Sequence, residues 1–173
     1  MTTAYIVTFI GDDRPGLVEQ LSSVIENSGG NWHESRLSQL GGKFAGLILV
    51  SLPADNGATL ESELKGLADS GISVRVTPTS SLTASSGGRR VRLVAMGPDR
   101  LGIVREIART LASLQVNVIE MDSEVSSAPM SGEQLFQTRI DAEIPDAVSL
   151  EALGDALDEV ANQLTLEIEL ETS

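Results

Sequence analysis

The chain has 173 residues, 41% of them apolar, a formal net charge of −13 and no cysteine. This composition supports a folded core, and the lack of cysteine excludes disulfide bonds and thiolate metal sites. Five basic and nine acidic residues lie in the first 80 positions, and seven basic and sixteen acidic residues lie in the rest. Neither part offers the basic surface that neutralises nucleic-acid phosphates, so no direct binding to nucleic acid is expected.

The N-terminal sequence has no basic leader and only a six-residue apolar run at 5–10, so it predicts no signal peptide. No stretch approaches the roughly 18 apolar residues that a membrane helix needs. A cytoplasmic protein with no membrane contact is expected.

The first part of the chain predicts the order β-α-β-β-α-β. Apolar residues at helical spacing indicate helices over 15–28 and about 60–68, and glycines at 29–30 and 71 end them. Short runs rich in apolar and β-branched residues indicate the strands. These strands are expected at 4–10, 31–39, 43–52 and 72–78.

The second part repeats this order. Helical stripes lie over 103–114 and 150–161, and strands are expected at 90–96, 116–125, 133–144 and 164–171. The order is that of the ferredoxin-like split βαβ unit. We therefore predict an α+β fold of two tandem βαββαβ units, each with an antiparallel sheet and its helices on one face.

Residue identities indicate that the two parts arose by internal duplication. At an offset of 86, seven residues of the first part meet identical residues of the second. They are Gly11, Asp13, Arg14, Gly16, Val18, Asn31 and Glu34. After the hairpin the offset is 92, so that Phe44 meets Phe136, and the six-residue insertion falls in the loop-like sequence "SSAPMSGEQ".

A polar stretch separates the two parts. Eight of the ten residues in 79–88 are Ser, Thr or Gly, which is typical of a flexible linker. We predict a first unit at 1–79, a linker at 80–88 and a second unit at 89–173. Units of about 80 residues are small for a self-sufficient core.

Strand 43–52 also indicates that the units associate. Phe44, Ile48, Val50 and Leu52 are expected on one side of this strand, and Ala45, Leu47 and Leu49 on the other. A sheet face in water should be polar. We therefore expect another sheet or subunit to cover the helix-free face, and the protein to form a homo-oligomer.

The repeated turn, "GDDRPGLV" and "GPDRLGIV", has two interpretations. In the structural one, Asp13 and Asp99 cap the following helices, Pro15 starts the first helical turn, and Gly16 and Gly102 let the helix pack closely on the strand.

In the functional interpretation, the helix N-terminus attracts the carboxylate of an amino acid, while a neighbouring glycine allows close approach of the backbone. Asp12, Asp13 or Asp99 could accept hydrogen bonds from the ammonium group. Asn31 and Asn117, which open the following strands, can both donate and accept. The sequence leaves both interpretations open.

The motif D-R-x-G-[LI]-V after a strand, with N-[WV] opening the next strand, resembles the ACT domain. Two such units joined by this linker resemble the glycine cleavage system transcriptional repressor family. The resemblance implies a non-enzymatic regulator that binds a small amino acid, with glycine the candidate, between ACT units and acts on a transcriptional activator through protein contact. No cofactor and no metal are implied.

The ligand-binding residues that follow from the motif lie at the two turns and the two strand starts. They are Gly11, Asp12, Asp13, Arg14, Pro15, Gly16, Leu17, Asn31, Gly97, Asp99, Arg100, Leu101, Gly102, Ile103 and Asn117. Leu101 stands where the first turn has Pro15, and Pro98 where it has Asp12, so the two sites need not bind alike.

An enzyme is not expected. The one histidine, His33, is interpreted as a partly buried structural residue, since its counterpart in the repeat is Ile119. No second His or Cys exists to build a zinc site, and no nucleophile or nucleotide motif is present. Two alternatives remain: a constitutive interaction module, and a detached regulatory subunit of an amino-acid biosynthetic enzyme.

Overall fold

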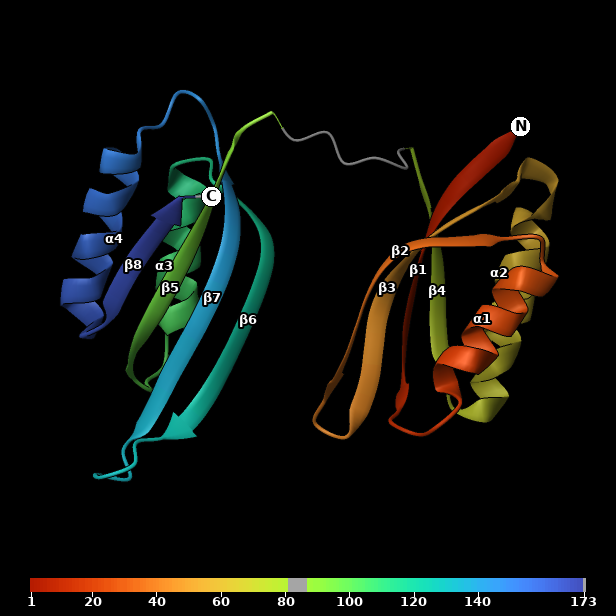
Figure 1. Ribbon diagram of the computed structural model, residues 1–173, viewed down its shortest axis with the longest axis horizontal. Coiled ribbons are helices and arrows are strands. Elements are labelled where there is room, and N and C mark those ends of the chain that lie inside the picture. Colours follow the sequence, from red (N-terminus) through yellow and green to blue (C-terminus); the bar gives the residue numbers. More distant parts are fainter. Residues whose placement is uncertain (81–86, 173) are drawn as a thin grey trace. The chain divides into compact units, whose positions relative to one another are not determined.

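The computed structural model describes residues 1–80 and 87–172 and divides the chain into two compact units, Met1–Ala84 and Ser85–Ser173. Residues 81–86 of the predicted linker lie outside the described residues. Each unit holds a four-stranded antiparallel sheet with two α-helices on one of its faces (Figure 1). The predicted fold class and the predicted order of elements are confirmed in both units.

The first unit follows the predicted order closely. Its elements are β1 (Thr2–Asp12), α1 (Leu17–Asn27), β2 (Asn31–Leu40), β3 (Lys43–Pro53), the 3-10 turn Ala54–Asn56, α2 (Gly57–Lys65), the 3-10 turn Gly66–Ser70 and β4 (Ser73–Thr79). The second predicted helix is shorter than its apolar spacing indicates, because its last residues form the 3-10 turn. Gly71, with φ of 80°, ends that turn in the left-handed region.

The second unit repeats the plan with a longer second α-helix. Its elements are β5 (Arg89–Pro98), α3 (Ile103–Ser113), β6 (Asn117–Ser127), β7 (Gln134–Ile144), α4 (Leu150–Leu164) and β8 (Glu167–Thr172). Ser149 caps α4, since its side chain accepts a hydrogen bond from the backbone N–H of Ala152. Thr165, in the left-handed region like Gly71, ends α4.

Both sheets have the same strand order, β2-β3-β1-β4 in the first unit and β6-β7-β5-β8 in the second. β1 and β2 both pair antiparallel with β3, so they run parallel to each other. The N-terminal ends of β1 and β2 consequently lie at the same end of the sheet. The start of β2 therefore lies far from the end of β1. The same holds for β5 and β6.

Each unit has its own hydrophobic core between its sheet and its helices. In the first, Val7, Ile48 and Val50 from the sheet meet Leu21 and Leu64 from the helices, and all five are fully buried.

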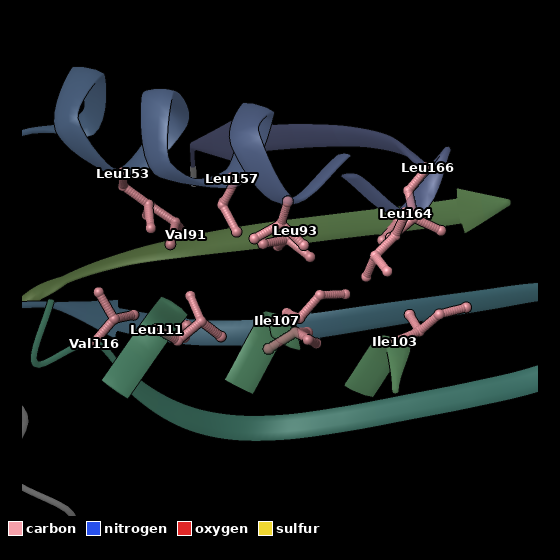
Figure 2. Packing of buried hydrophobic residues seen from close by; sticks show 14 of the residues in the cluster. Val91, Leu93, Ile103, Ile107, Leu111, Val116, Leu153, Leu157, Leu164 and Leu166 are labelled. Carbon is pink, nitrogen blue, oxygen red and sulfur yellow. The ribbon is translucent and has the colours of Figure 1, made fainter. Parts of the chain in front are cut away.

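In the second unit, Leu93 from β5 meets Ile107 from α3 and Leu157 from α4 (Figure 2). Burying one such side chain contributes about 1.5–3 kcal/mol, so this layer is the main source of stability for each unit.

Candidate functional site

The first turn connects β1 to α1 without a side-chain cap. Gly16 occupies the N-cap position with φ of 88° and ψ of −3°, and no side chain accepts a hydrogen bond there. The first intrahelical hydrogen bond runs from Gln20 N to Gly16 O, at 3.0 Å. Hence the backbone N–H groups of Leu17, Val18 and Glu19 have no acceptor within the helix and point out of its N-terminal end.

This geometry corrects the structural interpretation of the turn. Asp13 is not the cap of α1, and Pro15 lies before the helix rather than in its first turn. A Cβ on Gly16 would have no neighbour within 4 Å, so this glycine serves the left-handed backbone and not close packing. Gly102 repeats the arrangement, with φ of 92° and no side-chain cap on α3, so Asp99 does not cap α3 either.

Close packing is instead the role of the glycine that begins each motif. A Cβ on Gly97 would lie 2.7 Å from both Leu166 Cδ2 and Thr165 O. A Cβ on Gly11 would lie 3.3 Å from Gly71 O and from Leu17 Cδ1. Both glycines are buried, and they let the end of the strand approach the loop that precedes the last strand of the unit.

An open hollow of about 310 Å³ lies at the N-terminus of α1. Acidic and basic side chains, helix backbone and one aromatic ring line it. The lining residues are Asp13, Arg14, Gly16, Leu17, Val18, Glu19 and Phe44. Phe44 packs on Phe9 of the core, with ring centroids 5.9 Å apart, so the apolar wall of the hollow is anchored in the sheet.

The first turn is held in place from two sides. On one side, Asp13 N donates to Gly42 O at 3.1 Å, and Asp12 forms an ion pair with Lys43. The hydrogen bond and the positive charge of Lys43 lower the pKa of the exposed Asp12 carboxyl. On the other side, Arg14 donates to Gln20 Oε1 at 2.6 Å and to Ser70 O at 3.3 Å.

The second turn is built on the same backbone but has different side chains. Asp99 N donates to Gln134 O at 2.8 Å, which matches the bond of Asp13 to the hairpin. Leu101 takes the place of Pro15 and is 98% exposed. Glu106, at the position of Gln20, lies 3.7 Å from Arg109. Arg100 and Asp99 are exposed beside Gly102, and Ile103 is buried as Leu17 is.

The structure does not bring the two predicted asparagines to the turns within a unit. Asn31 is paired with Ser51 near the end of β3, whereas Asp12 is paired with Lys43 at its start. Eight positions of β3 separate them, about 26 Å at 3.3 Å per residue. Asn117 is paired with Glu143 and is equally remote from the second turn.

Sequence reasoning missed several residues of the first turn. Lys43, Gln20 and Ser70 are distant in sequence from the motif or lie outside it, and no spacing rule connects them to it. Phe44 carried a signal, since it recurs as Phe136 in the repeat. Its recurrence is also explained by packing, because Phe44 lies against the hydrophobic core of the first unit.

His33 differs from its prediction because it is exposed on β2 rather than partly buried. Its Nε2 lies 2.6 Å from Ser51 Oγ. Among the described residues, no group of three or more His, Asp or Glu side chains is placed to hold a metal ion.

Comparisons with known proteins place this geometry in a family. A family model described as the ACT domain matches residues 3–77. An unknown protein from Galdieria sulphuraria is 31% identical, with 100% of this chain and 99% of that chain covered and a TM-score of 0.88. The chain belongs to the ACT-domain family. Its second unit repeats the strand order of the ACT unit that the model matches.

A second solved structure has the same tandem ACT fold. It is described as a proposed glycine cleavage system transcriptional repressor and is 21% identical, with a TM-score of 0.75 over 100% of this chain and 98% of that one. The curated proteins contain no significant match. No helix in the described ranges 1–80 and 87–172 is long and apolar enough to span a membrane.

Proposed function

We propose that this tandem ACT protein is a non-enzymatic regulator that binds a small amino acid, with glycine the first candidate, and modulates a transcriptional activator through protein contact. The observation that carries the proposal is the uncapped N-terminus of α1 inside a hollow lined by charges of both signs. The similarity to a proposed glycine cleavage system transcriptional repressor supplies the candidate ligand and the regulatory role.

The charges at the hollow favour a zwitterion over a simple anion. The free N–H groups at the start of α1 and the nearby Arg14 attract a carboxylate. Asp13 and Glu19, which also line the hollow, repel an anion but attract an ammonium group. An α-amino acid carries both groups, and a volume of about 310 Å³ is at the lower end for ligand sites, which suits a small one.

One observation favours a constitutive interaction module instead. The left-handed glycine recurs at both turns, and a backbone requirement alone accounts for its presence in each motif. In that case neither turn binds a ligand, and the ACT units serve assembly only.

A thermal-shift screen of the twenty amino acids on the full chain separates these functions. We expect at least one small amino acid to raise the melting temperature, because a ligand at 100 times its dissociation constant adds about 2.7 kcal/mol of stability. Acetate and methylammonium, each half of the glycine zwitterion, serve as controls and should give no shift at the same concentration. If no amino acid shifts the transition, the interaction module is the correct function.

The negative charge of the chain also predicts that the protein does not bind promoter DNA by itself. With a net charge of −13, the purified protein alone should give no gel shift with promoter DNA at physiological salt. Retention on DNA should require an added activator protein. A shift by the ACT protein alone would contradict the proposed route through protein contact.

A further inference from the structure

The helix-free face of the first unit has an apolar centre that nothing within the unit covers. Five side chains of β1 and β3 form this apolar sheet face: Ile6, Ile10, Ala45, Leu47 and Leu49. They are cross-strand neighbours, because Ile6 is paired with Leu49 and Ile10 with Ala45, and Leu47 lies between those pairs. Ile10 is 49% exposed and Leu47 is 51% exposed, while α1 and α2 cover the opposite face.

The second unit shows that the fold does not need apolar residues at the positions of Ile6, Leu47 and Leu49. Arg92 and Asp141 occupy the places of Ile6 and Leu49, and they form an ion pair at 2.8 Å across the same strand register. Arg139 stands at the position of Leu47. The pair lowers the pKa of Asp141, as expected of charges that attract each other at the surface. The apolar sheet face of the first unit therefore serves a contact and not the fold.

Charge indicates a second copy of the chain as the occupant of this face. The chain carries −13, so two copies repel each other unless they meet where carboxylates are few. The carboxylates of Glu34 and Asp12 lie near the apolar sheet face, and each has a basic partner: Arg36 lies 2.7 Å from Glu34, and Lys43 forms an ion pair with Asp12. Arg75, opposite Thr8 on β4, adds a positive charge at the other edge.

The helix-free face of the second unit is unsuited to such a contact. Carboxylates alternate along its strands β6 and β8, at Glu120, Asp122, Glu124, Glu167, Glu169 and Glu171. Two copies that met there would bring like charges together. The first unit is therefore the surface through which two copies can approach face to face.

The size of the face agrees with a dimer contact. Four strands about 4.8 Å apart, at about 3.3 Å per residue, give a face on the order of 500 Å² per copy, or about 1,000 Å² in total. This is the lower end for a specific interface. A two-fold contact uses the same patch on both copies, and two sheets can pack aligned at about 10 Å.

We propose that two copies of this chain associate through the apolar sheet faces of their first units. The contact buries Ile6, Ile10, Leu47 and Leu49 of each copy. It is separate from the hollow at α1 and does not depend on an amino-acid ligand.

Analytical ultracentrifugation of the full chain over a wide concentration range tests this association. We expect a monomer–dimer equilibrium in the parent protein. The double variant Ile6→Arg with Leu49→Asp transfers the Arg92–Asp141 pair to the first unit, so it should keep the fold and weaken dimerisation by about tenfold or more, which corresponds to 1.4 kcal/mol. Met130→Asp, which removes an exposed apolar side chain in the loop between β6 and β7 of the second unit, is the control and should leave the dimer intact.

A thiol reporter gives a second measurement that does not depend on how the double variant folds. Because the chain has no cysteine, Leu47→Cys introduces a single reactive group on the face. Its labelling by a thiol reagent should slow as protein concentration rises through the dimer transition. A parent that stays monomeric, a dimer that survives the double variant, or labelling that is independent of concentration would each overturn the proposal.

Discussion

Replacing Gly16 or Gly102 by alanine lowers the free energy of unfolding of the unit that carries it by about 1–2 kcal/mol. Both glycines have φ near +90°, where an L side chain places its Cβ against the backbone. Open space around the position does not relieve this strain, because the clash lies within the residue itself. Urea or thermal melts of the two variants measure the effect.

Asparagine at the same positions is the matched control. It adds a larger side chain than alanine does but tolerates the left-handed region, so Gly16→Asn and Gly102→Asn should lose clearly less stability than the alanine variants. Equal stability of Ala and Asn variants would mean that the left-handed turn is not what these glycines supply.

The sign of this effect depends on where the helix starts. Inside a helix, Gly→Ala adds about 1 kcal/mol, and periodicity placed Gly16 in the helix that starts at Pro15. The structure starts α1 at Leu17 and leaves Gly16 outside it. A spacing of apolar residues predicts which residues face the core, but it does not report φ, so a glycine at the end of a helix can be assigned to the wrong side of the boundary.

The element order was predictable because its signals are local and occur twice. Apolar residues such as Leu21 and Ile25 recur at helical spacing, and the strands alternate in the register that their pairing needs. The second unit repeats each signal, so an error in one unit would have conflicted with the other. The order of elements was confirmed in both units. The predicted capping roles of Asp13 and Asp99, which also rested on both copies, were wrong because no side chain caps α1 or α3.

For the candidate site, the sequence could predict where the turn lies but not which side chains meet around it. The motif located the uncapped start of α1, but the ion pair of Asp12 with Lys43 joins residues 31 positions apart. That pairing depends on the hairpin register, which brings the start of β3 beside the end of β1. The distance of Asn31 from the turn follows from the same register, since β1 and β2 are parallel.

Comparison of the two units shows that their side chains differ at the turn and on the sheet while the fold is the same. The first combines a hollow lined by mixed charges with an apolar sheet face, and the second has a leucine exposed at its turn and an ion pair on its sheet. The backbone of the repeated turn is the same in both. If the two units differ in ligand binding, the difference comes from the side chains around the turn and not from its backbone.

The replacement Asp13→Asn should weaken binding of the amino-acid ligand strongly without changing stability. Asp13 is exposed and lines the hollow, and it caps nothing, so its carboxylate is free to accept from an ammonium group. A hydrogen bond to a charged group contributes about 1.5–3 kcal/mol, so binding should weaken by about 10- to 150-fold. Isothermal titration with the amino acid found in the screen measures the loss, and a thermal melt without ligand checks the fold.

Two further aspartates make this test specific. Asp12→Asn removes the same charge one residue away, but the Asp12 carboxylate is engaged by Lys43 and does not line the hollow, so binding should stay near that of the parent. Asp99→Asn makes the equivalent change in the second unit and reports whether that turn also binds. If Asp13→Asn binds as the parent does, the hollow at α1 is not the ligand site. If Asp12→Asn loses binding as severely as Asp13→Asn, the general negative charge of the turn, and not a contact from Asp13, attracts the ligand.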